Sequence, residues 1–389
     1  MKRVKLPLVV KVLIAIALGV AMGQIVPGAL VRGTNTFTAL FDQLLKFFIP
    51  LIIVGLVTSA IAEVGRGAGK MLLWTVALAY GFTVLSGLFA YLFSAELFPK
   101  MLASSSLEAL EDAGKEFAPY FTIAIPPLMD VMTALVLAFV LGLGIAFTGA
   151  SRLQKGFDEL KGIIVMSIEK VIIPLLPIYI FCLFLDMTAA GKVGPVIGEF
   201  LLVVAVIFIM TLVLLVLQYC IAGIVAHRNP FKMLAGMLPA YLTALGTASS
   251  AATIPVTLKC VVKNGVREEI AGFTVPLCAT IHLSGSTLKI TSCAIALMIM
   301  LDIPFDFSTI LGFILMLGVT MVAAPGVPGG AIMAALGILG SILGFDAVQQ
   351  ALMITLYIAM DSFGTACNVT GDGAISLIIN KFAKSAPKA

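Results

Sequence analysis

The chain has 389 residues, of which 61% are hydrophobic and 11% are charged, and its formal net charge is +4. No soluble domain needs so large an apolar share to fill its core, so the composition excludes a soluble globular protein and predicts an all-α polytopic membrane protein. The small positive charge gives no indication of a nucleic-acid partner. The six cysteines have no metal-ligand spacing, which predicts free thiols packed as small apolar residues.

Eight apolar runs are long enough to cross a bilayer at 1.5 Å per residue. They cover residues 8–27, 36–62, 71–98, 126–149, 163–188, 195–226, 270–300 and 347–380. The first run has no cleavage site after it, so we interpret it as a retained span. Most basic residues fall on one side if the spans alternate, which predicts cytoplasmic termini in the plasma (inner) membrane of the cell.

Two segments between these runs have a different pattern. Residues 231–262 and 310–343 each consist of two short apolar pieces around a small, polar centre, TALGTASSAATIP at 243–255 and AAPGVPGG at 323–330. Each piece is too short to cross the membrane, so we predict two re-entrant helical hairpins, with loops outside the membrane as the alternative. Interrupted segments in corresponding places indicate inverted repeats with a substrate site between the two tips.

The last apolar run has a polar stripe. Asp361, Thr365, Asn368 and Asp372 are spaced 4, 3 and 4 residues apart, which puts them on one face of a helix. Carboxylates in so apolar a segment are costly against lipid, so the stripe is expected to face a protein interior or a water-filled cavity. A functional site is the first interpretation, and a buried polar network that only joins helices is the alternative.

The seventh run repeats this spacing with His282, Ser286, Lys289 and Cys293, which predicts one shared helix face. Lys289 lies deep in the apolar run and therefore needs an acidic partner, for which both Asp372 and Asp361 are candidates. His282 is either a proton carrier or a hydrogen-bonded core residue.

These elements together predict an amino-acid site. Ser249 and Ser250, with Thr247 and Thr253 nearby, offer hydroxyls beside helix N-termini that suit a carboxylate. The second tip brings bare backbone close to a ligand and can hinge as a gate, through Gly326, Val327, Pro328, Gly329 and Gly330. Asp361 is the natural partner of an ammonium group.

At these residues the chain resembles the dicarboxylate/amino acid:cation symporter family, which includes the glutamate transporters. The most specific motifs are SSAATIP at 249–255, GVPGG at 326–330 and TACNVTGD at 365–372. The resemblance implies that Asp361 holds the substrate ammonium, that Asn368 contacts the substrate backbone and that Thr365 lies nearby. It also implies that Asp372 belongs to a sodium site, with Asn368 beside it. No other cofactor is expected.

The resemblance further implies a homotrimer in membrane lipid, in which a transport domain slides past a scaffold like an elevator. By this likeness the scaffold comprises residues 1–70 and 99–190, the transport domain comprises 71–98 and 191–380, and 381–389 is a cytoplasmic tail.

Two departures from the family pattern modify these expectations. Gly364 stands where members with acidic substrates have an arginine, which favours a neutral amino acid over a dicarboxylate. His282 and Ser284 stand where sodium-coupled members have an amide and an acid, and Ser286 completes this motif. We therefore expect sodium coupling to be weakened or lost, with proton coupling or exchange in its place and Lys289 as a tethered cation that could neutralise Asp372.

The competing readings are a conventional sodium-coupled symporter for an amino acid or a dicarboxylate, a channel, and, more remotely, an intramembrane hydrolase with a Ser–Lys pair formed by Ser249 or Ser250 and Lys289. We predict a transporter and no enzyme activity.

Overall fold

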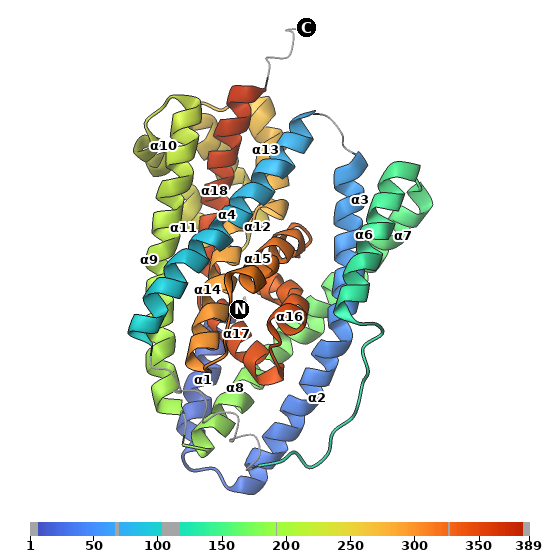
Figure 1. Cartoon of the computed structure of the whole chain (residues 1–389), viewed down its shortest axis with the longest axis vertical. Coiled ribbons are helices and arrows are strands. Elements are labelled where there is room, and N and C mark those ends of the chain that lie inside the picture. The colour runs from blue at the N-terminus through green and yellow to red at the C-terminus, as the bar shows by residue number, and fades with distance from the viewer. Residues whose placement is uncertain (1–6, 67–69, 103–116, 192, 326, 384–389) are drawn as a thin grey trace, which may run out of the picture.

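The computed structural model describes residues 7–66, 70–102, 117–191, 193–325 and 327–383, and this part of the chain is helical without strands. Figure 1 shows a long bundle with the end of the last helix, Asp361–Phe382, near one extreme and the helices of the first third reaching the other. Within the described residues, six helical stretches are long and apolar enough to cross a membrane, namely Gly28–Ala62, Met71–Met101, Val131–Thr148, Ser151–Ala189, Ile197–Ala226 and Glu268–Met300. This agrees with the polytopic membrane protein predicted from composition.

The first half of the chain supplies long, nearly uninterrupted helices. They are α1 (Leu8–Gly23), α2 (Gly28–Ile52), α3 (Thr58–Arg66), α4 (Lys70–Met101), α6 (Val131–Thr148), α7 (Ser151–Ser167), α8 (Ile173–Ala189) and α9 (Val193–Ala226). Two π-helical turns, Ile53–Val57 and Ile168–Ile172, join α2 to α3 and α7 to α8. Each turn lies within a few residues of a proline, Pro50 or Pro174, whose missing N–H interrupts regular helix bonding.

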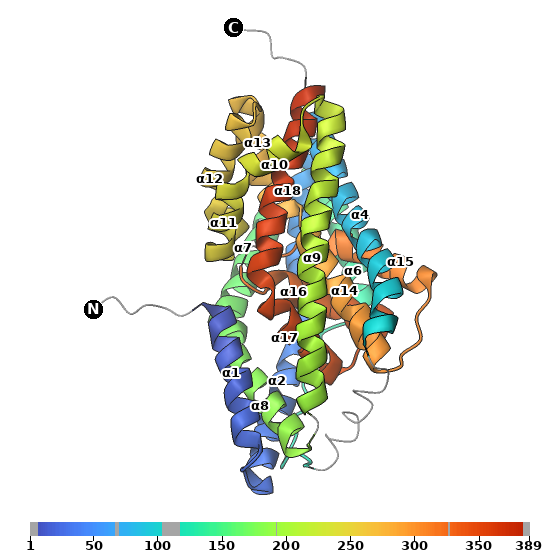
Figure 2. The same ribbon diagram turned by 90° about the vertical axis from the view of Figure 1, so that its left-hand side faces the viewer.

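The second half consists mostly of shorter helices, several of which form packed pairs. They are α10 (Pro230–Gly236), α11 (Leu238–Thr247), α12 (Ser250–Lys263), α13 (Glu268–Ile281), α14 (Ser284–Met300), α15 (Phe307–Val322), α16 (Gly330–Leu343), α17 (Ala347–Ala359) and α18 (Asp361–Phe382). The pairs α11/α12 and α15/α16 pack side by side and enclose the two polar centres noted in the sequence. Figure 2 shows that α11 and α12 run together and turn near the middle of the molecule.

Two predicted continuous spans are broken. The run at 270–300 is interrupted at His282 and Leu283, where the backbone leaves helical geometry between α13 and α14. The run at 347–380 bends by 64° between α17 and α18. The order of helix pair and then broken helix therefore occurs twice, in residues 238–300 and 307–382.

The break before α14 corrects one expectation. Ser286, Lys289 and Cys293 share α14, but His282 lies outside this helix and therefore does not share their face. The four residues of the polar stripe, by contrast, all lie in α18 and are all buried.

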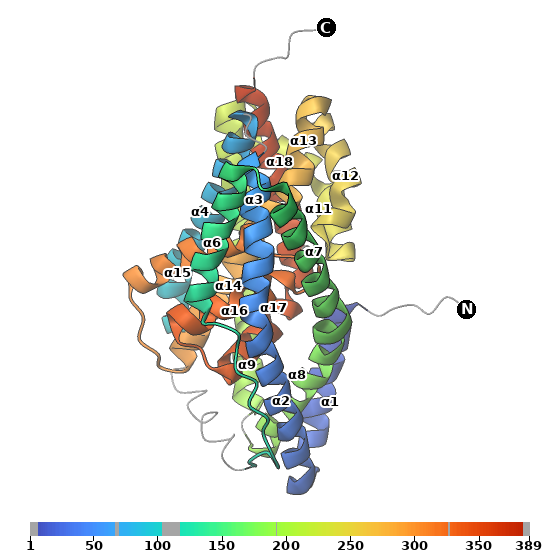
Figure 3. The same cartoon turned by 90° about the vertical axis from the view of Figure 1, so that its right-hand side faces the viewer.

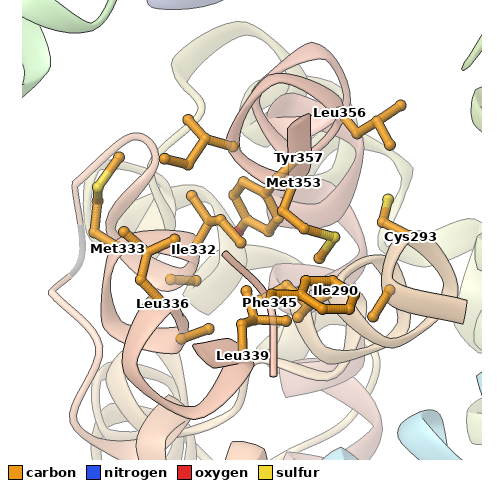
Figure 4. Packing of buried hydrophobic residues seen from close by; sticks show 14 of the residues in the cluster. Ile290, Cys293, Ile332, Met333, Leu336, Leu339, Phe345, Met353, Leu356 and Tyr357 are labelled. Atoms are coloured by element: carbon orange, nitrogen blue, oxygen red, sulfur yellow. The ribbon is translucent and has the colours of Figure 1, made fainter. Parts of the chain in front are cut away.

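Apolar packing fixes the position of the broken helices. Figure 4 shows side chains of α14, α16 and α17 in one cluster, among them Ile290, Ile332 and Met353, each of which is fully buried. The helices of the first half surround this core, and Figure 3 shows α2, α3, α6 and α7 along one side of the molecule. The polar ends of the broken helices are thereby held inside the protein.

Candidate functional site

One pocket brings together the turns of both helix pairs and the breaks of both broken helices. It has about 400 Å³ of space not filled by protein atoms, part of it open to solvent. It is lined by Ala248, Ser249, Ser250, Ala279, Thr280, Leu283, Ser286, Ala324, Pro325, Val327, Ala331, Tyr357, Asp361, Thr365 and Asn368. Segments separated by more than 100 residues thus converge on one pocket.

Asp361 is held at the first position of α18, next to the turn between α15 and α16. Its Oδ2 accepts a hydrogen bond of 2.8 Å from the backbone N–H of Gly329, and its side chain is almost completely buried. Gly329 has φ of +75°, a conformation that residues with a side chain rarely adopt, and this turn aims the N–H at the carboxylate. The second turn therefore contacts Asp361 through backbone.

Lys289 pairs with Asp361 and not with Asp372. Its Nζ lies 3.6 Å from Asp361 Oδ1, donates to the carbonyl oxygen of Met360 at 3.3 Å, and stands 3.7 Å from the centre of the Tyr357 ring. The hypothesis that Lys289 neutralises Asp372 is therefore wrong. Lys289 is not among the residues that line the pocket, because it reaches Asp361 from behind.

Asn368 joins α18 to the beginning of α14. Its Oδ1 accepts from the backbone N–H groups of Gly285 at 2.8 Å and Ser286 at 3.4 Å, and its Nδ2 donates to Ser286 Oγ at 3.2 Å. The first N–H groups of a helix have no partner within the helix, so the amide completes the N-terminus of α14. Ser286 Oγ also lies 2.9 Å from the hydroxyl of Tyr357.

The turn between α11 and α12 presents serine hydroxyls to the pocket. Ser249 caps α12 by accepting from the backbone N–H of Ala252 at 3.3 Å, and Ser250 lies directly after it. The hydroxyls of Thr247 and Thr253 lie 3.1 Å from each other, outside the pocket lining. Of the four hydroxyl residues considered from the sequence, Ser249 and Ser250 thus line the pocket.

Asp372 belongs to a second buried polar cluster. Its Oδ1 lies 2.9 Å from His282 Nδ1, and the amide of Gln218 donates to Ser284 Oγ at 3.0 Å. Asp372 Oδ2, Gln218 Oε1 and His282 Nε2 have no hydrogen-bond partner among the described residues. Two of these atoms are oxygens, the kind of ligand that a hard cation takes, while His282 already occupies the other carboxylate oxygen. The donor set thus fits a cation only in part.

These arrangements can be compared with known proteins. The profile of the sodium:dicarboxylate symporter family matches residues 8–382. The chain belongs to this family. It is therefore an integral membrane transporter. The hypothesis of an intramembrane hydrolase is wrong.

Relatives of this transporter include two bacterial proteins named serine/threonine transporter SstT. The protein from Streptococcus suis (strain 05ZYH33) is 29% identical over 339 residues, which cover 85% of this chain and 93% of the relative. The protein from Acinetobacter baumannii (strain AYE) is 28% identical over 385 residues, which cover 95% of each.

Not all of the predicted residues meet in this symporter's pocket. Ser249, Ser250, Val327, Asp361, Thr365, Asn368 and Ser286 line it, while Pro328, Gly329, His282, Ser284, Lys289 and Asp372 do not, and Gly326 lies outside the described residues. Gly329 still contributes through its bond to Asp361. Asn368 and Asp372, expected to share a sodium site, have different hydrogen-bond partners.

Tyr357 and Gln218 are two buried polar residues of these clusters that the sequence patterns did not single out. Tyr357 precedes Asp361 by four residues and is fully buried, and Gln218 is a lone buried amide in the long apolar helix α9. The signal for each was a polar group inside an apolar run, the criterion already applied to Lys289.

Proposed function

We propose that this protein is a secondary-active transporter of small neutral amino acids. The observation that carries the proposal is that the carboxylate of Asp361 and the hydroxyls of Ser249 and Ser250 line one pocket. An ammonium-binding group and a carboxylate-binding surface on the same cavity suit a zwitterion. The names of the relatives, serine/threonine transporters, agree with this class of substrate.

In the proposed complex the substrate ammonium binds Asp361, and the substrate carboxylate binds the serine hydroxyls and the N-terminus of α12. Thr365 lies one turn after Asp361 and donates its hydroxyl to the Asp361 carbonyl oxygen at 3.0 Å. Asn368 contacts the substrate backbone with the amide hydrogen that Ser286 does not take. Gly364 supplies no side chain for a second substrate carboxylate, which favours neutral substrates over dicarboxylates.

The proposed mechanism is of the elevator type. The scaffold comprises residues 1–70 and 99–190, and the moving transport domain comprises 71–98 and 191–380, with eight spans, two re-entrant hairpins and inverted repeats. The assembly is a homotrimer in the plasma (inner) membrane with both termini, including the tail 381–389, in the cytoplasm. The doubled order of helix pair and broken helix in 238–300 and 307–382 supports the repeat.

Sodium coupling is proposed to be weak or absent. Ser284 offers no charge, and the imidazole of His282 already occupies one oxygen of Asp372. A conventional sodium-coupled symporter is the second candidate, favoured by the two unpartnered oxygens of Asp372 and Gln218. Proton coupling and exchange remain the alternatives to sodium in this proposal.

The substrate is tested on the purified chain with a thermal-shift screen of the twenty amino acids, because a ligand that binds the folded state raises the melting temperature. Small or hydroxylated neutral amino acids are expected to give the largest shifts. Asp361→Asn should weaken their binding roughly tenfold to hundredfold, as expected for the loss of a charge-assisted hydrogen bond. The control is Asp346→Asn. Acidic substrates alone, or unchanged binding by Asp361→Asn, would contradict the proposal.

Coupling is tested in proteoliposomes by replacing external sodium with choline. Uptake within about twofold of the sodium value is expected. The double variant His282→Asn/Ser284→Asp, which restores the residues of sodium-coupled members, should gain sodium dependence. Uptake by the native chain that collapses in choline would establish the conventional symporter instead.

A further inference from the structure

A cation lies behind the wall of the proposed substrate site, next to Asp361. Lys289 is 1% exposed, lies deep in α14 and is surrounded by Asp361, the Met360 carbonyl and the face of the Tyr357 ring. A carboxylate, a carbonyl oxygen and an aromatic face all attract a positive charge. The environment is that of a charged ammonium group held next to Asp361.

The ammonium group takes its place because Gly364 has no side chain. A methyl group on Gly364 would collide with both Cε and Nζ of Lys289. Gly364 therefore lacks the arginine side chain and also leaves the space that the Lys289 ammonium group occupies. The positive charge that α18 lacks at position 364 is supplied from α14 by Lys289, with its Nζ against the backbone of Gly364.

Asp361 contacts both Lys289 and the turn between α15 and α16. One carboxylate oxygen accepts from the Gly329 N–H and the other faces Lys289. Both oxygens thus have a partner, and the charges of Asp361 and Lys289 cancel before any ligand arrives. A ligand with a net charge would leave one uncompensated charge in a region of low dielectric, which is costly.

We propose that Lys289 is the fixed counter-charge of Asp361 and restricts the site to ligands that carry an ammonium and a carboxylate together. This inference rests on the proposed function and names the residue that sets the charge class of the substrate. Lys289 is a specificity-determining residue that acts through Asp361. A ligand with an ammonium group alone competes with Lys289 for Asp361 and adds an uncompensated charge, whereas a zwitterion adds none.

The test uses three probes that differ by one charged group. They are serine, ethanolamine, which lacks the carboxylate, and 3-hydroxypropionate, which lacks the ammonium. Their affinities are measured by thermal shift on the purified full-length chain, and the readout is the affinity of each singly charged probe relative to serine. A relative affinity is independent of any general weakening of the site.

For the native chain we expect serine to bind and both singly charged probes to bind at least tenfold more weakly. Lys289→Gln leaves Asp361 without its counter-charge, so the affinity of ethanolamine relative to serine should rise tenfold or more. Lys289→Arg keeps the charge and should leave this ratio near the native value. A purely structural lysine would weaken serine and ethanolamine alike in Lys289→Gln, and that result would overturn the inference.

The reciprocal variant guards against misfolding of Lys289→Gln. Asp361→Asn leaves Lys289 as the uncompensated charge, so the affinity of 3-hydroxypropionate relative to serine should rise. The double variant Lys289→Gln/Asp361→Asn removes both charges. It should therefore lose both the gain in relative ethanolamine affinity and the gain in relative 3-hydroxypropionate affinity. Native protein that binds no neutral amino acid would overturn the proposed function, whereas serine binding with unchanged ratios in these variants would overturn this inference alone.

Discussion

Lys289 and Gly364 define each other's role in the candidate site. The ammonium group reaches Asp361 across the space that a side chain at position 364 would fill. From the sequence, the absence of arginine at Gly364 and the presence of a buried lysine were separate facts. In the structure the two facts are connected, because α14 and α18 pack closely enough for the end of Lys289 to fill the space beside Gly364.

Gly364→Ala should disturb both the substrate site and the stability of the fold. The added methyl group displaces the flexible end of Lys289, and the loss of the buried Lys289–Asp361 pair should lower the melting temperature. The ammonium group must then leave Asp361, and the affinity of ethanolamine relative to serine should rise as in Lys289→Gln. The matched control is Gly272→Ala, where nothing lies within 4 Å of the added methyl group. An unchanged ligand ratio in Gly364→Ala would contradict this account.

Tyr357 acts on the site in two separable ways. Its hydroxyl bonds to Ser286 and its ring faces the ammonium of Lys289. Tyr357→Phe keeps the ring, so serine affinity should fall roughly threefold to tenfold, the value of one hydrogen bond, with the ethanolamine ratio unchanged. Tyr357→Leu also removes the ring and should change the ratio. Equal effects of the two variants in the thermal-shift assay would refute this division of roles.

At the scale of helices, sequence patterns predicted the two helix pairs and the stripe on α18 but missed the breaks at His282 and Met360. Hydrophobic periodicity reports which residues are apolar, and both broken runs are apolar enough on average to be interpreted as single spans. The breaks are stabilised by distant partners, as where Asn368 accepts the first N–H groups of α14. Such partners become neighbours only in the folded protein. The misplacement of His282 on the Lys289 face followed directly from the missed break.

The start of α17 is fixed by a capping box. The Asp346 carboxylate accepts from the backbone N–H of Gln349, and the Gln349 side chain accepts from the backbone N–H of Asp346. Asp346→Ala should lower the free energy of unfolding by about 1 kcal/mol, measured by denaturation of the purified chain. Asp346→Asn keeps an oxygen at the cap and is expected to lose much less. Equal losses in both variants would assign the effect to charge and not to capping.

At the scale of the whole molecule, the proposed division into scaffold and transport domain predicts which contacts must slide. Helix α16 of the proposed transport domain packs on α2 of the proposed scaffold, where a methyl group on Gly337 would lie 2.8 Å from Ile49 Cγ2. Because Cγ2 is one bond of about 1.5 Å from Cβ, the two Cβ atoms would lie within about 4.3 Å. This separation suits a disulfide.

A disulfide between Gly337→Cys and Ile49→Cys should therefore abolish uptake in proteoliposomes and leave ligand binding by thermal shift intact, with uptake restored by reduction. Each single-cysteine variant is a control for the substitution itself. A second control is Gly19→Cys with Phe184→Cys, two positions in contact within the proposed scaffold, whose cross-link should not affect uptake. Undiminished uptake by the oxidised first pair would refute the proposed domain boundary.

The collision between a side chain at position 364 and the end of Lys289 also constrains how such transporters diverge. A mutation that introduces arginine at 364 places two cations in one space unless position 289 changes first. An evolutionary route from a zwitterion carrier to a carrier of acidic amino acids must therefore pass through loss of the lysine. In an alignment of relatives, lysine at position 289 and arginine at position 364 should not occur in the same sequence.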